Sequence, residues 1–285
     1  MSLWKGPPEH VFAPPPWYGR LVGSVRVVVI LSATLLAIAL MVLLQLAGRV
    51  MRTERAIEGL ARLWSRFALR GLGLAVEIRG TPLQTPSVVV ANHTTWLDTL
   101  ALRTGPFLTF VAKAEVADWP LFGQIAKINN TLFVARKASE AKRQEADMAE
   151  RLAQGERLIF FPEGTSSDAL RVLPFKSSLF STFCKPPMRD RIHVQPVALA
   201  WIAPEGQPSS FYGWWGDMGL ERNIWDIATR SFGGRLIITW CPPLSPADFS
   251  DRKALALAAE TAVAEALVAA GVDFQGQGKV AWGEG

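Results

Sequence analysis

The chain has 285 residues, of which 49% are hydrophobic and 19% are charged, and its net charge is +5. Soluble proteins average about 25% charged residues, so this composition excludes disordered, collagen-like and coiled-coil classes and indicates a folded, membrane-associated protein. The two cysteines lie far apart and form neither a disulfide framework nor a metal or redox pair, which favours a reducing compartment.

Residues 27–47 form an uncharged apolar run that is long enough to cross about 30 Å of hydrocarbon as a helix. We therefore predict one transmembrane helix, with a buried core helix and a cleaved signal peptide as the alternatives. The signal-peptide alternative is weak, because the run is long, starts late and follows prolines at 14–16. More arginines follow the run than precede it, so the positive-inside rule puts the C-terminal part in the cytoplasm.

Residues 49–74 predict a basic amphipathic helix, because apolar residues recur at helical spacing while Arg62, Arg66 and Arg70 fall on another side. This helix either packs first against the domain core or lies on an anionic leaflet with its arginines toward the headgroups, and both can hold together. The expected organisation is a Pro-rich tail at 1–24, the transmembrane helix at 25–48, the amphipathic helix at 49–74, a folded domain at 75–274 and a flexible tail at 275–285.

Beyond residue 75, short β-branched runs alternate with helical stretches. The expected strands are 76–79, 87–91, 108–112, 131–135, 158–161, 194–201 and 236–240. The expected helices are 96–103, 121–129, 139–155 and 252–270. This alternation predicts an α/β domain with a mostly parallel sheet and helices on both faces.

His93, one of three histidines, follows the expected strand 87–91 at a strand-to-helix turn, where α/β sheets usually place their ligands. Asp98 comes five residues later, which on a regular helix is about 140° out of phase, so the two side chains meet only if His93 precedes the helix. A carboxylate on one ring nitrogen would fix the tautomer and leave the other nitrogen basic, as a general base requires. The spacing alone arises by chance with an expectation of roughly 0.1 and is only suggestive.

A second cluster, Phe160 to Ser167, lies at the end of the expected strand 158–161, so two strand ends face one site. Taken singly, this cluster is also compatible with an ordinary Pro-Glu-Gly turn. A third strand, 131–135, ends at Arg136, whose guanidinium can hold a phosphate or a carboxylate, with a solvated surface arginine as the alternative.

In this order, the segments resemble the PlsC-type glycerolipid acyltransferase family over roughly residues 75–245. His93 to Asp98 is similar to the family's NHxxxxD block, and Lys113 lies in a stretch similar to its KxE motif. The arginine, FPEGT and apolar-proline blocks are matched by 132–136, 161–165 and 194–198. The resemblance implies a glycerol-3-phosphate acyltransferase-like fold and transfer of a fatty acyl chain from acyl-carrier protein or coenzyme A to a lysolipid hydroxyl.

The resemblance also implies roles for individual residues, with His93 and Asp98 as the catalytic pair. The substrate-binding residues that it implies are Arg136, Glu163, Gly164, Thr165, Ser166 and Lys113. Phosphate-handling members commonly have arginine where this chain has Ser166, and the stretch FPEGTSSD is similar to members that acylate lyso-ornithine lipid. Two acceptors therefore stay open: 1-acylglycerol-3-phosphate, which gives phosphatidic acid, and lyso-ornithine lipid, which gives ornithine lipid.

Other functions are a lipid esterase or lipase and a non-catalytic, membrane-anchored lipid-binding protein. The chain lacks the GxSxG nucleophile elbow of serine hydrolases, and intact His93 and Asp98 argue against a retired site. We expect no metal and no cofactor besides the acyl thioester. Basic residues gather beside the apolar run, which suits an anionic membrane and acidic acyl-carrier protein and disfavours nucleic acid. The expected location is a bacterial cytoplasmic membrane, crossed once, with the catalytic domain on the cytoplasmic face.

Overall fold

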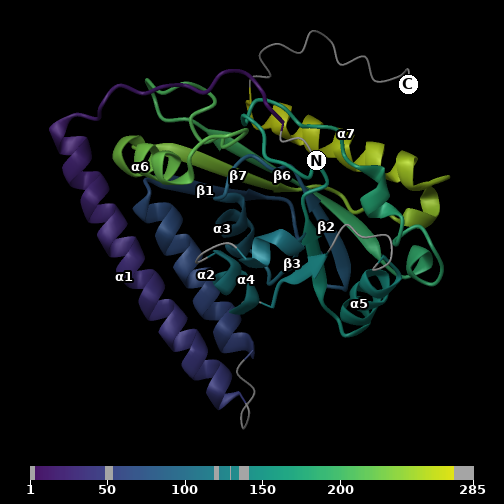
Figure 1. The fold of residues 1–285 in the computed structure, drawn as a ribbon. Helices are drawn as coiled ribbons and strands as arrows, with labels where there is room; N and C mark the ends of the chain where they lie inside the picture. The colour runs from purple at the N-terminus through teal and green to yellow at the C-terminus, as the bar shows by residue number, and fades with distance from the viewer. Residues whose placement is uncertain (1–3, 49–53, 119–121, 129, 135–140, 273–285) are drawn as a thin grey trace.

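The structure is a computed structural model that describes residues 4–48, 54–118, 122–128, 130–134 and 141–272. The expected tail 275–285 and part of the segment 49–74 lie outside the described residues. The described chain opens with an extended segment, residues 4–16, followed by two long helices, α1 (Trp17–Ala47) and α2 (Glu54–Gly71), which lie side by side (Figure 1).

The length and composition of α1 are sufficient for a membrane span. Its most apolar 18-residue window has a mean hydropathy of 3.0, and only 11% of that window is buried, which argues against a core helix. The helix begins at Trp17, ahead of the expected segment 25–48. Gly19 and Gly23, one helical turn apart, are buried against Thr229 of α6 (Leu220–Arg230). This close packing offsets the conformational cost of glycine in a helix.

In the described part of the chain, seven strands form one sheet in the order β1-β7-β6-β2-β5-β3-β4, and every neighbouring pair is parallel except β6 and β7. The strands are β1 (Leu74–Arg79), β2 (Ser87–Ala91), β3 (Thr109–Lys113), β4 (Leu132–Val134), β5 (Arg157–Phe160), β6 (His193–Ile202) and β7 (Gly234–Trp240). The mostly parallel sheet is therefore confirmed, with each strand within two residues of its expected bounds.

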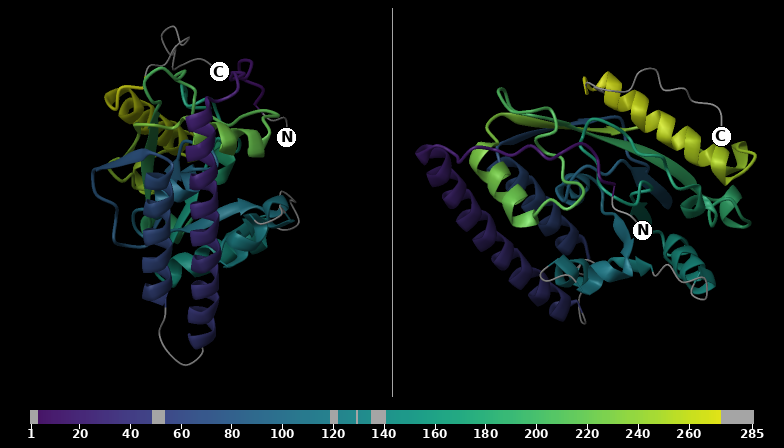
Figure 2. Two further views of the ribbon diagram at one scale, coloured as in Figure 1. Left: turned by 90° about the vertical axis from the view of Figure 1, so that its left-hand side faces the viewer. Right: turned by 45° about the horizontal axis from the view of Figure 1, so that its top comes forward.

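Helices cover both faces of the sheet because its strands bury alternate side chains on opposite sides (Figures 1 and 2). On β2, Val89 joins the core under α2, α3 (Asp98–Arg103) and α6, whereas Val88 joins the core under α5 (Ala141–Ala153) and α7 (Arg252–Ala269). A further short helix, α4 (Phe122–Ile128), follows β3. Of these helices, α6 was not expected from the sequence.

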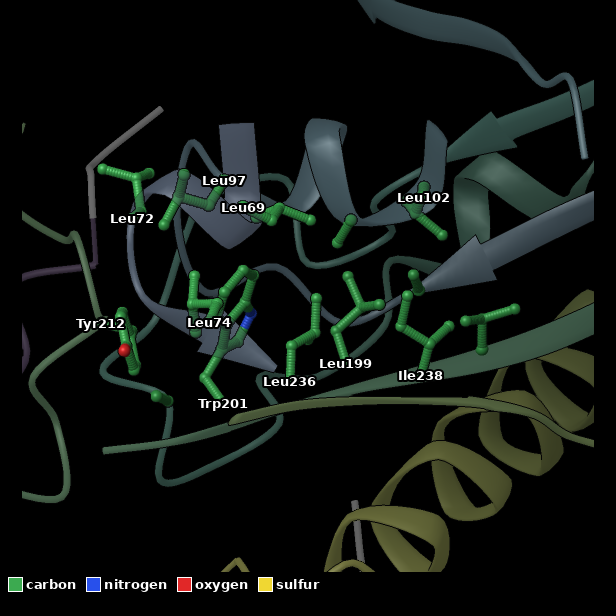
Figure 3. Close-up of a cluster of buried hydrophobic side chains, with 14 of the residues drawn as sticks. Leu69, Leu72, Leu74, Leu97, Leu102, Leu199, Trp201, Tyr212, Leu236 and Ile238 are labelled. Atoms are coloured by element: carbon green, nitrogen blue, oxygen red, sulfur yellow. The ribbon is translucent and has the colours of Figure 1, made fainter. Parts of the chain in front are cut away.

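Figure 3 shows the first of these cores, in which α2, α3 and the sheet meet. Leu69 of α2 and Leu102 of α3 pack with Leu199 and Trp201 of β6, and all four are almost completely buried. Leu97, the residue before α3, belongs to the same core, so this packing holds the start of α3 against the sheet.

The arginines of α2 do not all point where a membrane-surface helix would place them. Arg62 Nε donates to the Gly105 carbonyl at 2.9 Å, and Arg66 Nη2 donates to the Thr104 carbonyl at 3.0 Å. Carbonyls at the end of α3 lack helical partners and attract cations, which explains why these two side chains turn toward the domain. The residues exposed on α2 include Leu63 and Phe67, and the hydrogen bonds of Arg62 and Arg66 support the alternative in which α2 packs against the domain.

Candidate active site

His93 and Asp98 meet at the end of β2. The strand ends at Ala91 and α3 begins at Asp98, so His93 lies on the intervening turn, as the spacing required. His93 Nδ1 lies 2.7 Å from Asp98 Oδ2. The imidazole stacks on Phe161, with ring centroids 4.2 Å apart, and 22% of its side chain is exposed. With Nδ1 engaged, Nε2 is the nitrogen left for a substrate.

Four donors or potential donors converge on the fully buried Asp98 carboxylate. Besides the His93 ring, the backbone N–H groups of Thr94 and Thr95 donate to Oδ2 at 2.7 and 2.9 Å. The Trp201 indole donates to Oδ1 at 2.8 Å. Both oxygens are therefore held, so Asp98 fixes the orientation of the His93 ring rather than following it.

A turn after β5, residues 162–167, lies directly against the His93 segment; we call it the Glu163 turn. The buried Glu163 carboxyl accepts the backbone N–H groups of His93 and Leu173, at 2.8 and 3.1 Å. The Ser167 N–H donates to the His93 carbonyl at 2.8 Å. Burial raises the pKa of the Glu163 carboxyl well above its ordinary value, against the lowering effect of its two backbone donors. The buried Glu163 side chain therefore links the His93 segment to the backbone at Leu173.

Two lysines hold the carbonyl oxygens of the Glu163 turn. Lys113 Nζ, at the end of β3, donates to the Gly164 carbonyl at 2.8 Å, and Lys176 Nζ donates to the Glu163 carbonyl at 2.5 Å. Gly164 has a φ of +69°, which glycine tolerates best, and a Cβ there would meet Lys176 Nζ. The sequence did not single out Lys176, because its role depends on a contact with a turn thirteen residues earlier.

Thr165 and Ser166 form the part of the turn that remains available to a ligand. Both residues are partly exposed, and in the described part of the chain neither their backbone N–H groups nor their hydroxyls form hydrogen bonds. Arg136, the remaining expected substrate-binding residue, lies outside the described residues. Within the described residues, no group of three or more His, Cys, Asp or Glu side chains could hold a metal ion.

A loop between β6 and α6 also contacts the catalytic segment. The Trp214 N–H donates to the Thr94 carbonyl at 2.9 Å, and the Trp96 indole donates to Asn223 Oδ1 of α6 at the same distance. The helix that the sequence analysis missed therefore supports the turn between His93 and Asp98.

The fold and this site define an α/β enzyme whose His–Asp pair lies beside a polar turn at the carboxyl ends of parallel strands. Residues 75–200 match the family described as Acyltransferase. A lyso-ornithine lipid O-acyltransferase of Rhodobacter capsulatus is 39% identical over 269 residues, which cover 92% of this chain and 95% of that protein. The chain therefore belongs to this acyltransferase family, which confirms the PlsC-type resemblance.

Two further similarities extend this result. A 1-acyl-sn-glycerol-3-phosphate acyltransferase of Neisseria gonorrhoeae is 29% identical over 57% of this chain and 63% of that protein. The crystal structure of the Thermotoga maritima 1-acyl-sn-glycerophosphate acyltransferase PlsC matches with a TM-score of 0.62 and 20% identity, covering 87% of this chain and 98% of that one. At that identity the match establishes the shared fold alone.

Proposed function

We propose that this protein transfers a fatty acyl chain from an acyl thioester to the free hydroxyl of lyso-ornithine lipid. The observation that carries this choice of lysolipid is the similarity to the Rhodobacter capsulatus enzyme, which spans nearly the whole of both chains. A Brucella abortus lyso-ornithine lipid O-acyltransferase, 35% identical over 71% of this chain, supports the same choice. Ser166, which brings no positive charge to the Glu163 turn, suits an acceptor without phosphate.

In this proposal, His93 Nε2 accepts the proton of the acceptor hydroxyl while the hydroxyl oxygen attacks the thioester carbonyl. Asp98 holds Nδ1 at 2.7 Å, which fixes the tautomer and stabilises the imidazolium that forms. The tetrahedral intermediate expels the carrier thiolate, which takes the proton back from His93. The free N–H groups of Thr165 and Ser166 are the donors we assign to the developing oxyanion.

Lysophosphatidic acid is the second candidate acceptor, because the Neisseria gonorrhoeae relative is named for 1-acyl-sn-glycerol-3-phosphate. Arg136 would then hold the phosphate. For either acceptor, the donor that we propose is an acyl thioester of acyl-carrier protein or of coenzyme A.

We further propose that α1 inserts into the bacterial cytoplasmic membrane as a single span, with the catalytic domain on the cytoplasmic face. The mostly exposed apolar surface of α1 supports insertion. The acceptor would then reach the site from the bilayer in which it is dissolved.

The test is acyl transfer by the full chain in mixed micelles, with lyso-ornithine lipid or lysophosphatidic acid as acceptor and each thioester as donor. We expect product from lyso-ornithine lipid, and we expect His93→Ala to lower the rate by about 10²–10⁴-fold, the usual contribution of a positioned general base. His193→Ala, at the exposed start of β6, is the matched control and should keep the wild-type rate. Transfer to lysophosphatidic acid alone, or release of free fatty acid instead of transfer, would refute the proposal.

A further inference from the structure

Arg171 follows the Glu163 turn, and its guanidinium is fixed on two sides. Nε donates to both carboxylate oxygens of Asp168 at 3.1 Å, and Nη2 lies 2.9 Å from Asp168 Oδ2. The Asp168 side chain is fully buried, whereas 28% of the Arg171 side chain is exposed. The ring of Trp4 covers the guanidinium, with its centroid 5.3 Å from Cζ.

Nη1 of Arg171 forms no hydrogen bond in the described part of the chain. The other cations at the Glu163 turn, Lys113 and Lys176, donate to its carbonyl oxygens. Arg171 therefore combines an oriented guanidinium, a partly exposed side chain and Nη1 donors without a partner in the described residues, which suits an anionic ligand.

Both partners of the Arg171 guanidinium, Asp168 and Trp4, are linked to the catalytic segment. The link on the Asp168 side runs through the preceding residue, Ser167. The Ser167 N–H donates to the His93 carbonyl, and Ser167 Oγ donates to the Arg171 carbonyl at 3.3 Å. On the other side, Trp4 contacts Trp215, with ring centroids 6.4 Å apart. Trp215 follows Trp214, whose N–H donates to the carbonyl of the residue after His93. Arg171 is thus built into the surroundings of the site.

Trp4 reaches this position because the N-terminal segment folds back over the domain. Residues 4–16 run from the start of α1 across the molecule to the end marked N (Figures 1 and 2). The Trp215 indole donates to the Pro7 carbonyl at 3.0 Å. Phe12 packs edge-on against Phe211, with ring centroids 5.8 Å apart. The segment that precedes the membrane helix therefore completes the surroundings of Arg171.

We propose that Arg171, oriented by Asp168 and covered by Trp4, binds the carboxylate of the acceptor headgroup. This inference rests on the proposed function, because an ornithine headgroup contains a carboxylate and no phosphate. The buried Asp168 partly neutralises the guanidinium, which suits a monoanion, and the free Nη1 supplies donors for charge-assisted hydrogen bonds. Arg171 would then supply the headgroup contact that Ser166 lacks the charge to make.

The experiment compares lyso-ornithine lipid with its neutral carboxamide, in which the headgroup carboxylate has become an amide. The variant is the double substitution Asp168→Asn and Arg171→Met, since removal of Arg171 alone would leave a buried unpaired carboxylate. We expect the wild-type kcat/KM to be about 10-fold to 100-fold higher for the carboxylate acceptor, the usual contribution of a hydrogen bond to a charged group. In the double variant this preference should disappear, chiefly through a higher KM.

Arg79→Met is the matched control, because it removes an exposed arginine whose partners are Glu77 and the Ala269 carbonyl. It should keep the wild-type preference. A double variant that loses activity equally on both acceptors, or a wild type that does not distinguish them, would overturn the role of Arg171. If the wild type acylates lysophosphatidic acid and not lyso-ornithine lipid, the proposed function itself fails, and that result is visible before any variant is made.

Discussion

At the residue scale, the geometry around Asp98 predicts that an isosteric change will be costly. Asp98→Asn leaves one acceptor oxygen where the carboxylate offers two, so an amide NH2 must face either the Trp201 indole or the donors on Oδ2. The His93 ring then loses its orientation or its favoured tautomer. We expect kcat to fall by about 10²–10⁴-fold, measured as initial rates at saturating acceptor. An unchanged rate would mean that Asp98 is not required.

Glu163 gives a prediction about pH and stability. Its pKa is raised in the folded protein, so the folded state binds more protons than the unfolded state above the ordinary glutamate pKa. Its contribution is therefore complete at low pH and is lost as the pH rises through the folded-state value. Denaturant unfolding at several pH values should show stability falling with pH more steeply in the wild type than in Glu163→Gln. Parallel pH profiles would contradict this assignment.

Asp98 and Glu163 also show how much of the site could be predicted from the sequence. The contact between His93 and Asp98 followed from a strand end, a fixed spacing and the helical period, all of which are local. The direction of the Glu163 side chain did not follow, because its partners include Leu173, ten residues away, and the backbone of a different strand end. Lys176 and Arg171 were missed as functional residues for the same reason: their contacts are tertiary.

At the scale of elements, β2, β5 and β6 were predictable because a strand buried on both faces is a short continuous apolar run. The order of the strands could not be predicted, since the sequence of one strand does not indicate which strands it pairs with. The short helix α6 does carry a local signal, because Leu220, Ile224 and Ile227 recur at helical spacing, but the tryptophan-rich segment before it hid the pattern.

The packing of α1 on α6 predicts opposite effects for two glycines. A Cβ on Gly23 would lie 2.4 Å from Thr229 Cγ2, whereas a Cβ on Gly59 of α2 has no neighbour within 4 Å. Gly23→Ala should therefore destabilise the protein by about 1–3 kcal/mol through overpacking. Gly59→Ala should stabilise it by about 0.5–1 kcal/mol through helix propensity.

The measurement is the free energy of unfolding from denaturant titration in detergent, with both variants and the wild type at one detergent concentration. A Gly23→Ala protein as stable as Gly59→Ala would show that α1 and α6 do not pack this closely in solution.

At the scale of the whole molecule, the two sides of the sheet have different partners. α1 and α2 carry exposed apolar residues on one side, whereas α7 covers the other side (Figures 1 and 2). The N-terminal segment, which precedes α1, contacts the loop that supports the catalytic segment. We propose that the first side meets the bilayer. The acceptor would then be bound without leaving the lipid phase completely.

This orientation can be tested with one charge placed on either side. Leu35 of α1 is 66% exposed and Leu257 of α7 is 50% exposed, so lysine fits at both positions without disturbing the core. A lysine in the centre of a membrane helix costs about 2.5–3.5 kcal/mol of insertion free energy. Leu35→Lys should therefore reduce the fraction of protein that floats with phospholipid vesicles, whereas Leu257→Lys should float like the wild type. Equal flotation of both variants, or loss with Leu257→Lys alone, would place the bilayer elsewhere, because a charge is tolerated only on the side that faces water.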